Sequence, residues 1–209
     1  MLPFWEMTQE QRFKMVEIAV QKYGKVIGQM SGTIGEIYTT DWGENSHPRH
    51  CVVKTFPLTN QEAMETMTEE KVEKFLHELN EASKYWAHPS VHNFADIKIC
   101  WGIPFLISRK RDMTLRDAIE GGDLGICAAL SITIQLLNVL EWCGARGLSA
   151  HQDLKPENVF LDSWEEYYGL PSEHPLIYKV ALGDFGLANA FSMFGHKYGS
   201  RPYMAPEQY

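Results

Sequence analysis

Apolar residues at helical spacing define the first expected element of the chain. Between residues 8 and 23, phenylalanine, valine, alanine and tyrosine recur three or four positions apart, which is the period of one face of an α-helix. Thr8 and Gln11 fit a capping box at the start of this segment. Gly24 is expected to end it.

Beyond this helix the pattern changes to short β-prone runs. The runs KVIGQ, GEIYTT and CVVKTF, within residues 25–56, are separated by glycine-rich segments or by the polar sequence DWGEN. Short runs of this kind, bounded by turn residues, are typical of strands joined by hairpins. We therefore predict an antiparallel meander of three strands.

A second helix is predicted over residues 60–86, where apolar residues occupy one helical face. It should end before His88–Pro89, because the residue before a proline disfavours the α conformation. The runs FADIKICWG and IPFLIS then predict two further strands, joined by a turn that contains glycine.

The second half of the chain is predicted to be mainly helical. The polar connector near residues 108–113 is expected to be a hinge, and helical patterns follow at 114–120 and 126–146. From Cys127 to Cys143 the apolar residues are interrupted by serine, threonine, glutamine, asparagine and glutamate. We interpret this stretch as a buried helix that is too short and too polar to span a bilayer.

Composition and charge narrow the class of protein. With 209 residues, 44% of them hydrophobic and 12% aromatic, the chain can form one large core or two small lobes. It has 19 basic and 27 acidic residues and a net charge of −8, which argues against nucleic acid or an anionic membrane as a partner.

The cysteines and the N-terminus bear on the cellular compartment. None of the four cysteines forms a CxxC pair, so we predict free thiols rather than a zinc site or a disulfide framework. The first ten residues, MLPFWEMTQE, lack the basic and apolar regions of a signal peptide. A reducing, cytoplasmic location is expected, and secretion as an effector stays open.

Candidate chemistry begins in the segment SAHQDLKPENVFLD, residues 149–162. Asp153 can orient a hydroxyl group and accept its proton, Lys155 can neutralise phosphate charge, and Asn158 can supply an oxygen to a hard cation. Taken alone, the segment is equally well explained as a polar loop that ends a helix.

Three residues elsewhere change this balance. Asp184, in the sequence GDFG, can provide a second metal ligand. Lys54 lies on a predicted strand, and Glu78 on the following predicted helix can hold it as an ion pair. Phosphoryl transfer requires this set of parts: metal ligands, charge neutralisation on the phosphates, and a positioned acceptor.

In their order and spacing these motifs resemble those of eukaryotic-type protein kinases, from about Tyr23 to the last residue. CVVKTF is similar to the VAIK strand of that family, HQDLKPEN to its HRDLKPEN loop, DFG to its metal-binding triplet, and GSRPYMAPE to its GTxxYMAPE segment. The resemblance implies an α+β, bilobal fold with an antiparallel N-lobe sheet, one long helix, and an abbreviated, mainly helical C-lobe. The implied domains are a helical extension at 1–22, an N-lobe at 23–109 and a C-lobe at 110–209.

The resemblance also implies roles, residue by residue. Asp153 would be the catalytic base and Lys155 a phosphate contact, Asn158 and Asp184 would bind Mg²⁺, and Lys54, Glu78, Gly28, Gly32 and Gly35 would bind ATP. The implied function is transfer of the γ-phosphoryl group of ATP to a serine or threonine of a protein substrate, because Lys155 follows the serine/threonine-kinase pattern.

The chain departs from the family at three places. Met30 stands where the glycine-rich loop would have its first glycine. Gln152 replaces the arginine that pairs with a phosphorylated activation loop, so regulation by such phosphorylation is not expected. The sequence stops two residues after Glu207, which leaves three alternatives open: a minimal kinase, a fragment of a longer kinase that is inactive alone, or a pseudokinase-like binding module. In the first case a stabilising partner or a dimer would be needed to cover the 126–146 helix.

Overall fold

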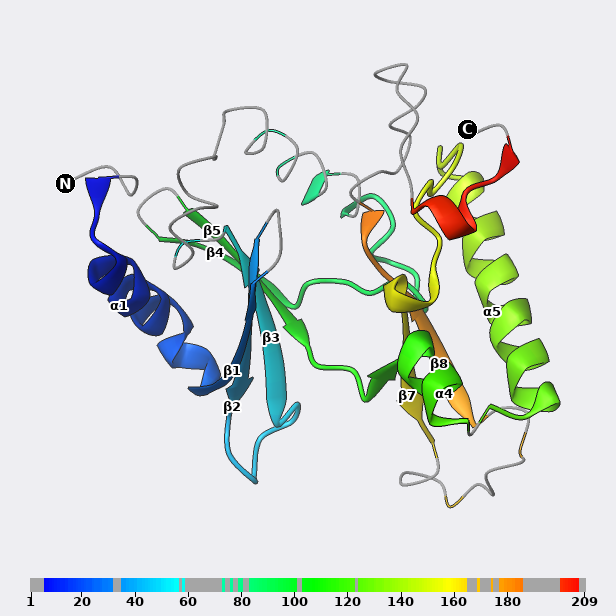
Figure 1. Ribbon diagram of the computed structural model, residues 1–209, viewed down its shortest axis with the longest axis horizontal. Coiled ribbons are helices and arrows are strands. Elements are labelled where there is room, and N and C mark those ends of the chain that lie inside the picture. The colour runs from blue at the N-terminus through cyan, green and yellow to red at the C-terminus, as the bar shows by residue number, and fades with distance from the viewer. Residues whose placement is uncertain are drawn as a thin grey trace. The chain divides into compact units, whose positions relative to one another are not determined.

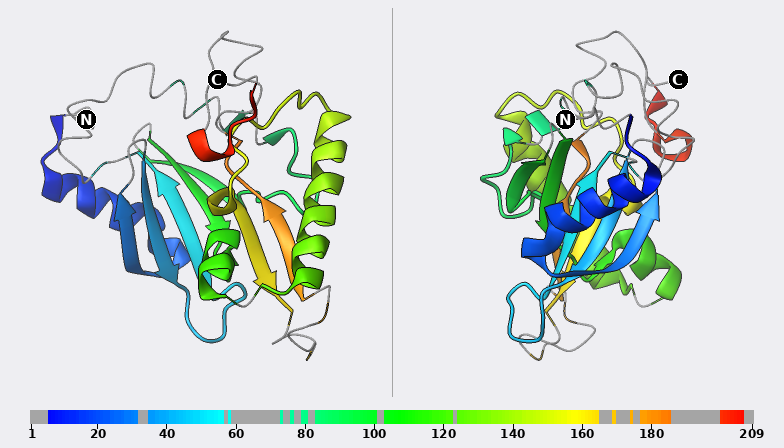
Figure 2. Two further views of the ribbon diagram at one scale, coloured as in Figure 1. Left: turned by 45° about the vertical axis from the view of Figure 1, so that its right-hand side comes forward. Right: turned by 90° about the vertical axis from the view of Figure 1, so that its left-hand side faces the viewer.

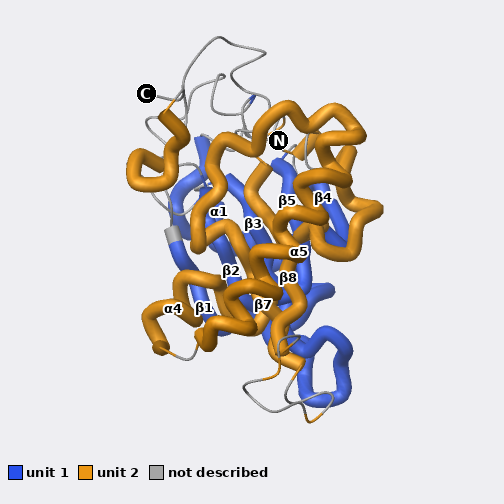
Figure 3. The backbone as a smooth tube through the Cα atoms, turned by 90° about the vertical axis from the view of Figure 1, so that its right-hand side faces the viewer, with its two compact units in different colours: residues 1–75, 94–110 blue, residues 76–93, 111–209 orange. Residues whose placement is uncertain are grey.

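The protein, seen in a computed structural model, divides into two compact units. Unit 1 comprises residues 1–75 and 94–110, and unit 2 comprises residues 76–93 and 111–209 (Figure 3). The structure describes residues 6–31, 35–56, 58, 73, 76, 79–80, 83–100, 103–122, 124–164, 169, 174, 177–185 and 200–206. The last crossing between the units, after Lys110, falls within the polar connector.

Unit 1 is built on a five-stranded antiparallel sheet (Figure 1). Its strands are β1 (Lys25–Ser31), β2 (Glu36–Asp41), β3 (His50–Thr55), β4 (Asp96–Cys100) and β5 (Ile103–Arg109), in the order β1-β2-β3-β5-β4. Every neighbouring pair is antiparallel. The predicted meander and the two later strands are therefore confirmed.

Helix α1 (Gln9–Val20) packs on one face of this sheet, as the right-hand view of Figure 2 shows. Thr8 is its N-cap, and the reciprocal hydrogen bonds with Gln11 form the predicted capping box. The buried face of α1 includes the charged residue Arg12, whose Nε donates to the carbonyl oxygen of Leu58 at 2.5 Å. The helix is thus an integral part of unit 1, because its apolar stripe completes the core on this side of the sheet.

Unit 2 combines a three-stranded antiparallel sheet with two helices. The strands are β6 (Met113–Thr114), β7 (Val159–Ser163) and β8 (Tyr178–Leu182), and the helices are α4 (Leu115–Gly121) and α5 (Ile126–Gly144). Two short 3₁₀ helices, η3 (Pro156–Asn158) and η5 (Arg201–Tyr203), carry loop residues of the candidate site. The α+β class is confirmed.

Helix α5 lies along β8 (Figure 1). Gln135, near its middle, bridges the two elements: its Nε2 donates to the carbonyl oxygen of Tyr178 at 3.0 Å, and its Oε1 accepts from the amide of Val180 at 3.1 Å. These two hydrogen bonds explain why a glutamine lies in an otherwise apolar helix, because they satisfy one carbonyl and one amide group of β8. Ile132, Val139 and other side chains of α5 enter the core of unit 2.

The prediction that the 126–146 helix is buried is wrong for one of its faces. Four large apolar side chains are mostly exposed: Ile126 (74%), Leu130 (57%), Ile134 (58%) and Leu137 (61%). They recur at intervals of three or four residues and so form one stripe, which the part of the chain that the structure describes does not cover. By length and composition the helix is long and apolar enough to cross a membrane, so the prediction that it is too short and too polar to do so is wrong on that criterion. That is weak evidence, because a helix that packs in a soluble core passes the same test.

The helix predicted over residues 60–86 lies mostly outside the described residues. Of its C-terminal part, Ser83 is helical and residues 84–87 form turns. The helical conformation thus ends before His88–Pro89, as expected from the proline.

Candidate active site

The loop after α5 brings three predicted site residues into direct contact. The carboxylate of Asp153 is buried, and its Oδ2 accepts hydrogen bonds from Lys155 Nζ at 2.7 Å and from Asn158 Nδ2 at 3.0 Å. Asn158 Nδ2 also donates to the carbonyl oxygen of Asp153 at 2.8 Å. These hydrogen bonds hold the three polar side chains together in one arrangement. A polar loop that only ended a helix would not require such contacts.

The segment that follows β8, beginning with Gly183 and Asp184, contacts this loop. The amide of Gly183 donates to the carbonyl oxygen of Asn158 at 2.9 Å. The next residue, Asp184, has a φ of 58°, which is uncommon for a residue other than glycine. Asn158 and Asp184 are therefore brought to adjacent points of the backbone.

Two aromatic contacts hold the chain immediately after Asp184. Phe185 is buried and stacks on Tyr85, with ring centroids 5.3 Å apart. It also meets the edge of His151 at 4.9 Å, and His151 Nε2 lies 3.1 Å from the carbonyl oxygen of Gly183. Burial lowers the pKa of His151, although the nearby charge of Asp184 acts in the opposite direction. A neutral imidazole thus supports the turn that leaves Asp184 exposed.

Ser200 approaches Asp153 from a distant part of the sequence. Its hydroxyl donates to Asp153 Oδ1 at 2.8 Å and accepts a hydrogen bond from Lys155 Nζ at 3.0 Å. Burial alone would raise the pKa of Asp153, but the hydrogen bonds from Lys155 and Ser200 outweigh it and hold this pKa below its usual value. The carboxylate is therefore ionised at neutral pH and already receives a hydroxyl group.

The donor set fits a hard divalent cation. Both hydrogen bonds that Asn158 makes to Asp153 use its Nδ2, so its Oδ1 is the atom it can offer to a metal. Asp184 adds a carboxylate at the neighbouring position, and oxygen ligands of these types are those that Mg²⁺ prefers. Among the described residues there is no group of three or more histidine, cysteine, aspartate and glutamate side chains that could hold a metal.

The remaining predicted site residues belong to unit 1 or are not described. Lys54 lies on β3, opposite Ile37 of β2 and Leu106 of β5, and its side chain is half-buried. Gly35 is required by sterics, because a Cβ there would lie 2.4 Å from the carbonyl oxygen of Thr55. Gly28 lies in β1, where a Cβ would make only ordinary contacts. Gly32 and Glu78 lie outside the described residues, so the predicted Lys54–Glu78 ion pair stays a prediction.

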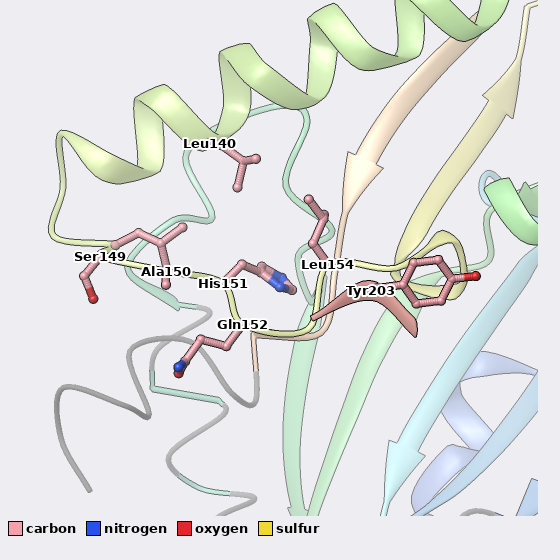
Figure 4. A pocket seen from close by; sticks show the side chains of 8 residues that line it. Leu140, Ser149, Ala150, His151, Gln152, Leu154 and Tyr203 are labelled. Carbon is pink, nitrogen blue, oxygen red and sulfur yellow. The ribbon is translucent and has the colours of Figure 1, made fainter. Parts of the chain in front are cut away.

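A pocket of about 310 Å³ lies beside the loop, between the end of α5 and Tyr203 (Figure 4). Its lining combines apolar side chains, those of Leu140, Leu148 and Leu154 among them, with polar ones such as His151 and Gln152. The polar groups of Asp153, Lys155 and Asn158 do not line it. This pocket is therefore separate from the polar cluster that carries the chemistry.

Sequence reasoning missed a polar cluster next to this site. Arg116, in the first turn of α4, donates from Nε to Glu157 Oε1 at 3.0 Å and from Nη2 to the hydroxyl of Tyr203. The partners of Arg116 are 41 and 87 positions away in the sequence. No periodicity or motif spacing in the sequence indicates such contacts.

The comparisons with known proteins agree with the motifs. A sequence model of the family described as protein kinase domain matches residues 22–208. Serine/threonine protein kinase OSK3 of Oryza sativa subsp. indica is 38% identical over 93 residues, which is 43% of this chain and 15% of that protein. Serine/threonine-protein kinase grp of Drosophila melanogaster is 39% identical over 79 residues, or 35% of this chain and 13% of that protein. The matched part thus spans only a small fraction of these relatives.

Proposed function

The chain belongs to the protein kinase domain family, and from this premise we propose that it is an ATP-dependent serine/threonine kinase acting on a protein substrate. The observation that carries the proposal is the hydrogen bond between the Ser200 hydroxyl and Asp153 Oδ1 at 2.8 Å. An ionised carboxylate that already accepts a hydrogen bond from an aliphatic hydroxyl has the geometry required of a base for a serine or threonine acceptor.

The other side chains supply charge and position. In phosphoryl transfer the protein mainly positions the reactants and stabilises charge on the phosphoryl oxygens. Asp153 would orient the acceptor hydroxyl and take its proton as the oxygen attacks the γ-phosphorus, while the bond from that phosphorus to the β–γ bridging oxygen breaks and ADP leaves. Lys155 would keep its ammonium group beside that oxygen, where it offsets the negative charge of the incoming phosphoryl group.

The proposed cofactors are ATP and Mg²⁺, in line with the family. Asn158 Oδ1 and the Asp184 carboxylate would hold the metal, and Lys54, Glu78 and the glycines Gly28, Gly32 and Gly35 would contact the nucleotide. Bound Mg²⁺ would neutralise charge on the β- and γ-phosphates. Gly35 has a structural role independent of nucleotide, because β2 and β3 could not otherwise approach so closely.

The preference for serine or threonine rests on two observations. Lys155 contacts both the base and a serine hydroxyl, and the similar curated proteins are named serine/threonine kinases. Because the chain spans 15% or less of those proteins, their substrates and partners are not transferred to it.

Phosphate transfer from radiolabelled ATP to a generic acceptor protein tests the proposal. Wild type should label serine or threonine, as phosphoamino-acid analysis would identify, and Asp153→Asn should be slower by ~10²–10⁴-fold. Asp184→Asn should lose activity in a way that higher Mg²⁺ concentration partly restores. Equal labelling by all three proteins would refute the assignment of the site.

A binding module without catalysis is the second candidate, and the exposed apolar stripe on α5 favours it. Such a patch is typical of a surface that contacts another protein. The two candidates differ in their response to nucleotide. A kinase must gain thermal stability when MgATP is well above its dissociation constant, and Asp184→Asn should reduce that gain. A module that does not bind nucleotide would show no gain.

A further inference from the structure

A single guanidinium group connects three segments of unit 2. Arg116 belongs to α4, Glu157 to η3, and Tyr203 to η5. The Nε of Arg116 donates to Glu157 and its Nη2 donates to the Tyr203 hydroxyl. Glu120, one turn along α4, lies 3.8 Å from the same Nε. The group therefore acts as a brace between the candidate catalytic loop and the segment that carries Ser200.

Each end of this brace lies close, along the chain, to a side chain that is hydrogen-bonded to Asp153. Glu157 immediately precedes Asn158, whose side chain is hydrogen-bonded to Asp153. Tyr203 ends the 3₁₀ turn that starts at Ser200, and its amide donates to the Ser200 carbonyl oxygen at 2.8 Å. A displacement of the Tyr203 ring would therefore move Ser200 relative to the carboxylate.

The chemistry of arginine suits this connection. Its planar guanidinium presents several N–H groups in fixed directions, so it can serve two acceptors at once, whereas lysine is a single point charge. Hydrogen bonds from a charged donor are roughly twice as strong as neutral ones. The contact pairs a guanidinium group with a carboxylate, because the Nε of Arg116 lies 3.0 Å from Glu157 Oε1.

We propose that Arg116 is a positioning residue that keeps Ser200 on Asp153 by linking Tyr203 to Glu157. The kinetic consequence rests on the proposed kinase function, but the structural consequence does not. Arg116 touches no reacting group in this arrangement and acts only through the two segments that it joins.

Kinetics of five variants test the catalytic consequence: Arg116→Ala, Arg116→Lys, Tyr203→Phe, Ser200→Ala and the double variant Arg116→Ala/Tyr203→Phe. Misplacement of a catalytic group by about 1 Å can cost ~10²-fold, so kcat should fall by about 10- to 100-fold in Arg116→Ala while KM for ATP stays the same. The double variant should be no slower than Arg116→Ala, because both changes break one connection. Arg116→Lys should recover part of the rate.

The split between kcat and KM separates positioning from general stabilisation. A residue that only stabilised the fold would lower the melting temperature and leave the kcat of the folded protein unchanged, and Arg116→Lys would then recover no rate.

Hydrogen exchange tests the structural consequence without relying on activity. The amides of Tyr203 and Met204 are hydrogen-bonded within η5, and in Arg116→Ala and Tyr203→Phe they should exchange about tenfold faster. The amides of α5 should keep their rates. Arg49→Ala is the matched control, since Arg49 also makes two hydrogen bonds to a carboxylate, that of Asp41, but belongs to unit 1.

The outcomes distinguish this proposal from the proposed function. If residues 200–206 exchange faster in Arg116→Ala than in wild type, and the wild-type protein transfers no phosphate, the brace is supported and the proposed kinase function is refuted. Unchanged exchange at these residues in Arg116→Ala would overturn the brace, whether or not the protein is active. A fall in kcat with additive effects of the two substitutions would also overturn it, because Arg116 would then act by another route.

Discussion

Replacement of Arg111 by methionine should destabilise unit 2 severely. Arg111 Nη1 lies 2.5 Å from Asp162 Oδ2, and the two side chains are only 11% and 7% exposed. Arg111 Nε also donates to His92 Nδ1 at 3.3 Å. Asp162 is on β7, and the amide of His92 donates to the Leu182 carbonyl oxygen at the end of β8. Arg111 therefore stabilises both strands that lead to the candidate site.

The magnitude follows from burial. Methionine fills a similar volume but removes the positive charge from a carboxylate that is almost completely buried, and such a loss costs about 3–5 kcal/mol. Total stabilities are about 5–15 kcal/mol. For a chain of about 150–250 residues, each kcal/mol corresponds to about 2–4 °C in melting temperature. The expected decrease is therefore roughly 6–20 °C.

Urea unfolding, followed by circular dichroism and tryptophan fluorescence, measures the effect. Arg49→Met is a matched control, because it breaks a hydrogen-bonded arginine–aspartate pair whose side chains are 48% and 26% exposed. Exposed pairs contribute about 0–1 kcal/mol, so this variant should unfold almost as wild type does. The double variant Arg111→Met/Asp162→Leu should regain most of the lost stability, because it removes the buried charge as well.

Two results would refute this reasoning. A loss of less than about 1 kcal/mol in Arg111→Met would mean that solvent or another group compensates the Asp162 charge, contrary to its burial. A double variant as unstable as the single one would mean that the guanidinium acts through packing rather than through charge.

Two further predictions concern the core of unit 2 and its thiols. Gly183→Ala should destabilise by about 1–3 kcal/mol, because the new methyl group would lie 2.6 Å from the ring of Phe160; thermal unfolding would show this, and an unchanged melting temperature would contradict it. Cys127 should react with iodoacetamide in the native protein at pH 8, since it is exposed. Cys143 should react only after unfolding, because it is buried and burial raises its pKa to about 11; peptide mass spectrometry distinguishes the two sites.

The strands and helices could be predicted where the pattern is local. The capping box of Thr8 and Gln11 and the β-prone runs depend on residues within a few positions of one another. The same holds for the contacts among Asp153, Lys155 and Asn158, which lie within one loop. The hydrogen bond between Ser200 and Asp153 joins residues 47 positions apart. The motif at Ser200 indicated which segment belongs to the site, but it could not show that the hydroxyl contacts the base.

The exposure of α5 could not be predicted from its own sequence, because burial depends on what packs against a helix. Ile132 and Ile134 have the same side chain and lie two positions apart on α5, yet Ile132 is 3% exposed and Ile134 is 58% exposed. Successive helical positions are separated by 100°, so these two residues point in opposite directions. Both faces of α5 are therefore apolar. One of them contacts β8, and the described part of the chain does not cover the other, so apolar composition alone could not show which face is buried.

The backbone conformation at the site could not be predicted from the sequence. Gln152 and Asp184 both have positive φ, 66° and 58°, although neither is glycine. A left-handed conformation costs such residues about 1–2 kcal/mol, so tertiary contacts must compensate. The compensating contacts come from their buried neighbours: His151 reaches the carbonyl oxygen of Gly183, and Phe185 packs against the His151 ring. One pair of aromatic side chains thus stabilises both strained turns, which place Asp153 and Asp184 at the site. A substitution at His151 should therefore disturb both carboxylates together.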